Sequence, residues 1–383
     1  MKITIKRTDD QLALVKAMGS NNREEAYEAQ AAVADLMGPV INEVINNAPT
    51  IANLFSTMTF GADDNPSIPL DLFYDITDED FITVYSQQVA GGLPYSQVFP
   101  AHNELKFSTY TLDSAFAFDK KYVRKSRLDV VSKTFTRMAQ EILLKQEKTA
   151  YNVLATALVR GDTKIGATAS AAGNHIIGST TENQFTLNDF NKLITRCKRI
   201  SASFSGGTPV GGSKVGVTDL MVSPEMVQEL RAMAYQPVNT RSGSVTTSGA
   251  TSIAAPDDLR ATLYSAAGLP SFYGINIIEI LELGVGQRFN KIFDAIVTAN
   301  SATVIGGGNS GTFVQADDEI LIGIDRSRDS LVRPVVLDEG SSAEFSVLVD
   351  DQFSIRQNKV GYFGKLEEGR VCLDDRALVG IVV

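Results

Sequence analysis

The chain has 383 residues, 44% of them hydrophobic and 21% charged, a composition that excludes a disordered or fibrous protein. Its 35 basic and 45 acidic residues give a net charge of −10, which makes the chain a poor direct binder of nucleic acid. No apolar run approaches the roughly 18 residues of a membrane-spanning helix, and we expect no signal peptide. Two cysteines, Cys197 and Cys372, predict no disulfide framework.

Residues 1–57 are expected to form an arm rather than a domain. Helical patterns cover Asp9–Met18 and Arg23–Ile45, with interruptions expected at Gly19 and at Gly38 and Pro39. Their apolar faces are too small to form a core alone. We therefore expect the arm to pack on the body of the same chain or on a neighbouring chain.

Residues 58–112 form a long polar segment with modest apolar content, which predicts an extended two-stranded excursion from the body of the protein. Strand-like runs over Phe81–Val89 and Leu105–Leu112 flank a segment with Gly and Pro turn signals. An isolated hairpin is only marginally stable in water, so this one requires a partner surface.

The longest helix signal lies at Asp129–Arg160. Its apolar residues alternate at spacings of three and four, the pattern of a helix with one buried face. A helix of about 30 residues spans roughly 45 Å. We expect Gly161 to end it and a large part of the molecule to lie along it.

The rest of the chain mixes helix and strand signals. A capping box predicts a helix over Thr186–Ser203, and Ser223 followed by Pro224 predicts the start of another. Strands are expected at four apolar runs: Ile275–Leu283, Ile292–Ala299, Thr303–Ile305 and Glu319–Ile324. The C-terminal stretch is ambiguous between helix and strand and ends as a buried strand.

No constellation of residues predicts an enzyme. Gly206–Lys214 lacks the Gly-Lys-Ser/Thr order of a phosphate loop, and no triad or metal cluster is recognisable. The acidic runs at 317–319 and 374–375 are expected on solvated turns, and both histidines, His102 and His175, are expected at the surface. We therefore expect no catalytic residue, no cofactor and no metal site.

Two clusters of opposite charge suggest a contact between copies of the chain. The clusters consist of five acids in the excursion and five bases before the long helix: Asp71, Asp75, Asp78, Glu79 and Asp80; Lys120, Lys121, Arg124, Lys125 and Arg127. They can be two solvated surfaces, or the acidic segment of one subunit can lie on the basic helix start of another. Single exposed pairs contribute at most about 1 kcal/mol, but a repeated network can set the register of an assembly.

This order of parts resembles the major capsid protein of tailed double-stranded-DNA phages, the Hong Kong 97-type fold. In residues the resemblance is strongest at three stretches: VTDLMVSPEMVQELRAM (Val217–Met233), LPSFYGINIIEI (Leu269–Ile280) and the C-terminal FSIRQNKVGYFGKLEEGRVCLDDRALVGIVV. None of the three is a catalytic motif, and the resemblance rests on their order along nearly the whole chain.

The resemblance implies an α+β fold with five parts. Residues 1–57 would be the N-terminal arm, 58–112 the E-loop, 113–205 the peripheral domain with its spine helix, 206–345 the axial domain, and 346–383 the return to the peripheral domain. It also implies a structural protein that forms hexamers and pentamers of an icosahedral shell around double-stranded DNA, without sequence-specific DNA binding. A separate scaffolding protein, a portal and possibly a decoration protein would be partners, and the chain would be a virion component assembled in the host cytoplasm.

One alternative keeps the fold and changes the function: an encapsulin-type nanocompartment shell. The long arm and long extended loop favour the phage protein. A soluble hydrolase is a remote alternative of another class, because it would need convergent acids or a nucleophile in a pocket.

Overall fold

The computed structural model describes residues 8–48, 50–61, 64, 66–69, 104–125, 128–164, 175–202, 216–232, 271–272, 274–302, 304, 311–337, 344–350 and 357–383. The chain divides into two compact units, which are described separately. Unit 1 comprises Met1–Ile68, Leu105–Tyr151 and Leu331–Val371, and unit 2 comprises Pro69–Glu104, Asn152–Ser330 and Cys372–Val383. Helices and mixed sheets occur in both units, so the expected α+β class is confirmed.

Unit 1 is built from the N-terminal end of the sequence, a middle segment and a late segment that stops before the C-terminal residues. Its elements are α1 (Asp9–Met18), α2 (Arg23–Asn46), the 3-10 turn η1 (Ile51–Leu54), β1 (Ser56–Gly61), β2 (Ser67–Pro69), β3 (Glu104–Lys106), β4 (Tyr110–Asp119), α3 (Lys120–Arg124), the first part of α4 (Leu128–Lys164), β10 (Leu331–Leu337), β11 (Phe345–Asp350), β12 (Lys359–Glu368) and β13 (Val371–Cys372). Strand β12 lies antiparallel between β4 and β11, and it joins β10, which pairs with β1 in parallel. Strands β2 and β3 form a separate pair.

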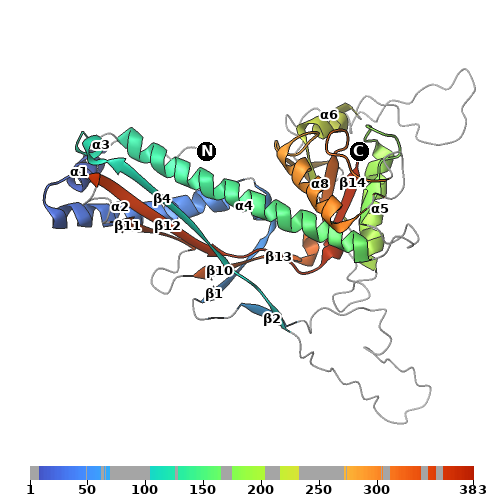
Figure 1. The fold of residues 1–383 in the computed structure, drawn as a ribbon, viewed down its shortest axis with the longest axis horizontal. Helices are drawn as coiled ribbons and strands as arrows, with labels where there is room; N and C mark the ends of the chain where they lie inside the picture. Colours follow the sequence, from blue (N-terminus) through green and yellow to red (C-terminus); the bar gives the residue numbers. More distant parts are fainter. Residues whose placement is uncertain are drawn as a thin grey trace, which may run out of the picture. The chain divides into compact units, whose positions relative to one another are not determined.

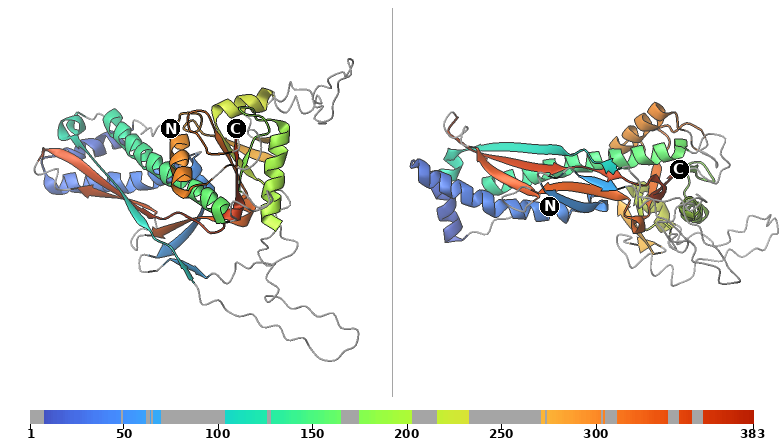
Figure 2. Two further views of the ribbon diagram at one scale, coloured as in Figure 1. Left: turned by 45° about the vertical axis from the view of Figure 1, so that its right-hand side comes forward. Right: turned by 90° about the horizontal axis from the view of Figure 1, so that it is seen from below.

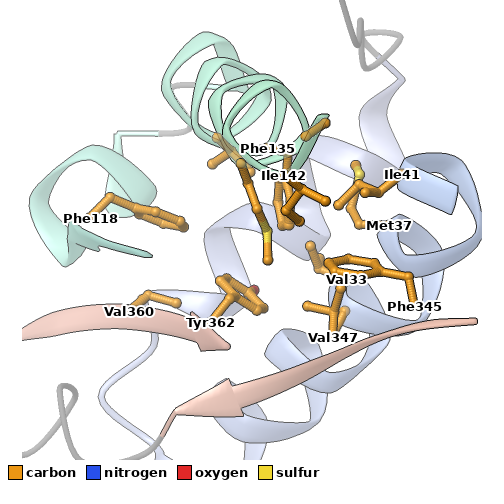
Figure 3. Close-up of a cluster of buried hydrophobic side chains, with 14 of the residues drawn as sticks. Val33, Met37, Ile41, Phe118, Phe135, Ile142, Phe345, Val347, Val360 and Tyr362 are labelled. Atoms are coloured by element: carbon orange, nitrogen blue, oxygen red, sulfur yellow. The ribbon is translucent and has the colours of Figure 1, made fainter. Parts of the chain in front are cut away.

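The core of unit 1 lies between helices α2 and α4 and the inner face of strands β4, β11 and β12. Figures 1 and 2 show α4 alongside β4 and β12, and Figure 3 shows side chains from both helices and the strands pointing toward one another. The rings of Phe116 and Phe135 are 5.1 Å apart, and Tyr362 stacks 5.5 Å from Phe116. Gly364 permits this closeness, because a Cβ there would lie 1.8 Å from the methyl carbon of Met138.

The N-terminal helices pack on unit 1 of their own chain. Val15 and Met18 of α1, and residues of α2 such as Val33 and Ile41, belong to its core. Helix α1 has the predicted bounds, but the expected interruption of α2 at Pro39 is wrong, since the helix continues through it to Asn46. Buried side chains on both sides of Pro39 hold the helix together despite the lost hydrogen bond.

Helix α4 is longer than predicted. It has 37 residues and continues through Gly161 to Lys164, so the expected stop at Gly161 is wrong. A Cβ on Gly161 would lie 3.0 Å from the ring of His175, and this glycine therefore serves close packing rather than helix termination. His175 is 1% exposed and its Nδ1 lies 2.9 Å from the Leu378 carbonyl oxygen, so its expected surface position is also wrong. His102 lies outside the described residues.

Unit 2 contains a second mixed sheet with helices around it (Figure 1). Its elements are the end of α4, β5 (Ile176–Gly178), α5 (Leu187–Ala202), β6 (Asp219–Val222), α6 (Pro224–Ala232), β7 (Ser271–Phe272), β8 (Ile275–Glu279), α8 (Arg288–Asn300), β9 (Ile320–Ile324), the turns η3 (Arg326–Arg328) and η4 (Asp375–Ala377), and β14 (Leu378–Val382). The strand order is β5-β14-β9-β6-β8-β7. Helices α5 and α6 share a core with β6, β8, β9 and β14.

The strand predicted at Ile292–Ala299 is wrong, because these residues belong to helix α8. The run is rich in β-branched residues, but Phe289, Phe293 and Val297 are buried at intervals of four. The ring of Phe293 lies 4.9 Å from Phe313, which holds the helix on its unit.

Candidate functional site

The basic helix start predicted from sequence lies at α3, directly after β4. Lys121 and Lys125 are exposed and Lys120 is partly buried, while Val123 beneath them is fully buried. Because their side chains are exposed, Lys121 and Lys125 are available for a contact with another molecule.

Arg124 has a role within its own chain. Its Nε donates to the Gly19 carbonyl oxygen at 3.0 Å, and its Nη2 donates to Asn21 Oδ1 at 2.7 Å. These bonds fix α3 on the turn between α1 and α2. A Cβ on Gly19 would lie 2.9 Å from Arg124 Cγ, so glycine is needed for this approach.

The other members of the predicted contact are not placed. Asp71, Asp75, Asp78, Glu79 and Asp80 lie outside the described residues, as does Arg127. The acidic and basic clusters are therefore not brought together here, and their pairing between subunits stays a prediction.

A buried charge network, which the sequence analysis missed, lies in unit 1 around Glu368. This side chain is 0% exposed, and its Oε2 accepts from Arg333 Nε at 2.7 Å and from Gln146 Nε2 at 2.9 Å. Arg370 Nη2 lies 3.4 Å from both carboxylate oxygens, and the Tyr110 hydroxyl donates to Oε1 at 3.2 Å. One carboxylate thus joins two strands, the long helix and the arginine after β12.

Arg370 extends this network to the arm, and Arg333 extends it to the residue before β11. Arg370 Nη1 donates to the Ala52 carbonyl oxygen at 3.0 Å, and its guanidinium lies 5.2 Å from the ring centre of Phe55. Arg333 Nη1 contacts Glu344 Oε2 at 3.3 Å. Burial lowers the pKa of Arg370, while Glu368 opposes that change.

The Tyr110 hydroxyl lies in the same buried environment beside Glu368. Burial, together with the negative charge of Glu368, raises the pKa of Tyr110 to about 12. The hydroxyl therefore keeps its proton at neutral pH and acts as a donor to Glu368. The Glu368 network has a structural role, because its buried polar groups are partners of one another.

In unit 2 three acidic side chains have shifted pKa values: the pKa of Asp189 is lowered, and the pKa values of Asp318 and Glu319 are raised, mainly by burial. Asp189 accepts backbone and hydroxyl hydrogen bonds from Thr180 and Thr186, and the Asp189 amide lies 3.4 Å from the Thr186 hydroxyl, which confirms the predicted capping box. The cap predicted at Ser223 is also confirmed, since its Oγ accepts from the Met226 amide at 3.1 Å.

Glu319, directly before β9, is 2% exposed and Asp374 is 8% exposed, so the expected place of these two acids on solvated turns is wrong. The backbone amides of Glu319 and Val383 each donate to the other residue's carbonyl oxygen, both at 2.9 Å. Burial, with Glu225 and Glu229 nearby, raises the pKa of Glu319 to about 7, although a hydrogen bond with Ser223 opposes the shift.

Within the residues described by the structure, no group of three or more His, Cys, Asp or Glu side chains could hold a metal ion. In the same part of the chain, no helix is long and apolar enough to cross a membrane. The phosphate-loop-like Gly206–Lys214 lies outside the described residues.

Comparison with known proteins gives structural likenesses only. No family model and no curated protein sequence matches the chain. Similar solved structures include the capsid of the cyanophage P-SCSP1u, with 12% sequence identity, a TM-score of 0.48 and 86% of each chain covered. The capsid of a native GTA particle has 11% identity and a TM-score of 0.47, covering 87% of this chain and 89% of that one.

The holo-SrpI encapsulin complex from Synechococcus elongatus is also similar, with 9% identity and a TM-score of 0.40, covering 86% of this chain and 85% of that one. Phage capsids are thus prominent among the similar structures, with an encapsulin beside them. With TM-scores below 0.5, these likenesses do not by themselves assign the chain to a family.

Proposed function

We propose that this chain is a major capsid protein of the Hong Kong 97 type, which builds the head of a tailed phage. The observation that carries the proposal is the order of parts along the chain. A helical arm is followed by an excursion whose ends are paired as β2 and β3, then by α4, which runs from unit 1 into unit 2. The C-terminal residues then supply strands to both units.

The sequence resemblance supports the same proposal. In the stretch Val217–Met233, strand β6 is followed by the Ser223 cap and helix α6, the strand-Ser-Pro-helix order that carries the resemblance. We propose the corresponding parts as arm 1–57, E-loop 58–112, peripheral domain 113–205 and 346–383, and axial domain 206–345.

The shell is proposed to consist of hexamers and pentamers that enclose double-stranded DNA without sequence-specific binding. A net charge of −10 suits a container that should not adhere to its genome. A scaffolding protein, a portal and possibly a decoration protein would act with it during assembly in the host cytoplasm. The chain is proposed to act as a structural protein and not as an enzyme.

Charge pairing between subunits is proposed to guide assembly. The acidic segment formed by Asp71, Asp75, Asp78, Glu79 and Asp80 of one copy would meet the basic helix start formed by Lys120, Lys121, Arg124, Lys125 and Arg127 of another. A network of such pairs sets orientation more than affinity.

Electron microscopy of the purified full-length chain, alone and with its genomic neighbours, tests the proposed function. We expect closed shells or rings of six and five subunits. A chain that stays monomeric under every condition contradicts the proposal. Shells that enclose an enzyme instead of DNA would replace the phage reading with the encapsulin-type alternative.

A further inference from the structure

The strands β4, β12 and β11 have a second face, opposite the core. Their register places Leu348, Phe363 and Ala115 in one row across the three strands. Successive side chains of a strand point to opposite faces. Because Val360 and Tyr362 on β12 belong to the core, Phe363 and its row point away from it.

This outer face has an apolar centre and charged ends. The row on one side of Leu348 and Phe363 contains Asp350, Gly361 and Ala117, and the row on the other side contains Ser346, Lys365 and Asp113. We call Leu348, Phe363, Ala115 and Ala117 the outer strip.

Charged pairs close both ends of the outer strip. Lys365 lies opposite Asp113 at one end, and Lys359 lies opposite Asp119 at the other. Both aspartates belong to β4 and are exposed, so acidic side chains follow one edge of the strip.

Solvent alone does not explain such a face. Leu348 is 57% exposed, although a sheet face turned to water normally carries polar residues. An apolar centre with a polar rim is the usual anatomy of a protein–protein interface. The outer strip therefore has the properties of a contact surface.

Helix α3 carries a surface of complementary character. Tyr122 is 43% exposed, and Lys121 and Lys125 beside it are also exposed. An aromatic ring that can anchor on an apolar surface is thus flanked by two cations. We call Tyr122, Lys121 and Lys125 the α3 end.

The two surfaces do not cover each other within one chain, since Tyr122 and Leu348 are both exposed. Arg124 also fixes α3 on the turn between α1 and α2. Their contact therefore requires two chains. The same lysines cannot meet the acidic segment 71–80 and the outer strip at once, so this contact is an alternative to the charge pairing proposed above. The outer strip is preferred because its described residues present apolar side chains together with the carboxylates of Asp113 and Asp119.

We propose that the outer strip of one copy binds the α3 end of a second copy. Tyr122 would pack on Leu348 and Phe363, and a lysine beside it would meet Asp113, two residues before Ala115 on β4. The contact joins different surfaces of two identical chains, so it can repeat around a ring or across a shell. It rests on the proposed shell function and names one contact of that shell.

Cross-linking between two singly substituted full-length chains tests the proposal. One chain carries Ala115→Cys and the other Lys121→Cys, both in a Cys372→Ser background, which leaves Tyr122 and Leu348 intact. The chains are co-assembled and treated with a short bismaleimide. We expect a covalent dimer that forms at least tenfold more when both variants are present than with either alone.

Lys133→Cys, an exposed position on α4, replaces Lys121→Cys in the control pair and should give no such dimer. Shells that form without the specific dimer would overturn this contact and leave the proposed function intact. Equal cross-linking in the control pair would also overturn the contact. A parent chain that never leaves the monomeric state would overturn both.

A matched pair of charge insertions gives a second readout. Leu348→Asp should reduce the yield of assembled particles at least tenfold, with an unchanged circular dichroism spectrum of the monomer. Leu36→Asp, on an α2 side chain that is 49% exposed, should assemble like the parent. Normal assembly of Leu348→Asp, or equal loss in both variants, contradicts the proposal.

Discussion

Glu319 links the stability of unit 2 to pH. Its pKa in the folded chain is about 7 against an ordinary value of 4.5, because the carboxylate is buried and faces Glu225 and Glu229. Between about pH 4.5 and pH 7, the Glu319 carboxyl is ionised in the unfolded chain but keeps its proton in the folded chain. Stability therefore falls as pH rises from about 4.5 to about 7 and stays at the lower level above that.

The substitution Glu319→Gln removes this ionisation. We expect the variant to be more stable than the parent at pH 8, by on the order of 1–3 kcal/mol, and close to the parent at pH 5. Urea unfolding of the two proteins at both pH values measures the difference. The same pH dependence in variant and parent would show that Glu319 is not the group responsible.

Asp189 has the opposite dependence on pH. Burial acts to raise its pKa, but hydrogen bonds from Thr180 and Thr186 outweigh burial and hold the pKa below its ordinary value. Its contribution is present at neutral pH and is lost as pH falls below its ordinary value. We expect Asp189→Ala to destabilise the chain by about 1–2 kcal/mol at pH 7 and by less in acid. Asp35→Ala, at an exposed position on α2, serves as the control and should change stability by less than about 0.5 kcal/mol in the same titrations.

At the scale of elements, the network around Glu368 ties β10, β12, α4 and the arm together. Removing one member of a buried ion pair leaves its partner charged without compensation, which costs about 3–5 kcal/mol. We expect Glu368→Gln to lower the free energy of unfolding by an amount of this order. Glu367, one residue earlier, is only partly buried and bonds Thr109 at 2.9 Å, so Glu367→Gln should cost less than about 1 kcal/mol. Similar losses in both variants would show that the network does not stabilise the unit.

Local signals in the sequence predicted the helix starts well. Thr186 with Asp189, and Ser223 with Pro224, form caps within a few residues, and such geometry does not depend on distant parts of the chain. The stop expected at Gly161 failed because packing against His175, not helix propensity, requires glycine there.

Tertiary information explains the remaining differences. Helix α8 replaced an expected strand because Phe289, Phe293 and Val297 find buried places on one helix face. For the candidate site, charge clustering identified the exposed lysines of α3. The local sequence does not distinguish them from Arg124, which donates a hydrogen bond to the arm at Gly19. The Glu368 network joins residues far apart in sequence, so no local pattern could indicate it.

At the scale of the whole molecule, we expect different residues of α3 to serve folding and assembly. Lys121→Glu together with Lys125→Glu changes exposed side chains, so the monomer should keep its stability within about 0.5 kcal/mol while assembly is lost. Arg124→Glu should instead loosen the α1–α2 turn, because two hydrogen bonds to it disappear. Sedimentation measures assembly, and limited proteolysis of the monomer measures loosening of the turn. Normal particles from the double lysine variant would remove α3 from the assembly surface.

Strands from the start of the chain pair with strands from its last part, so the sheets can be completed only late in synthesis. Strand β1 joins β10, with Ser56 bonded to Leu331 across 275 residues, and β14 lies inside the sheet of unit 2 between β5 and β9. A ribosome that has delivered the chain only to about residue 330 has completed neither sheet. An interrupted translation product therefore lacks β11 and β12 and cannot present the outer strip. In the proposed shell, unfinished copies would be excluded from a growing particle because they lack this contact surface.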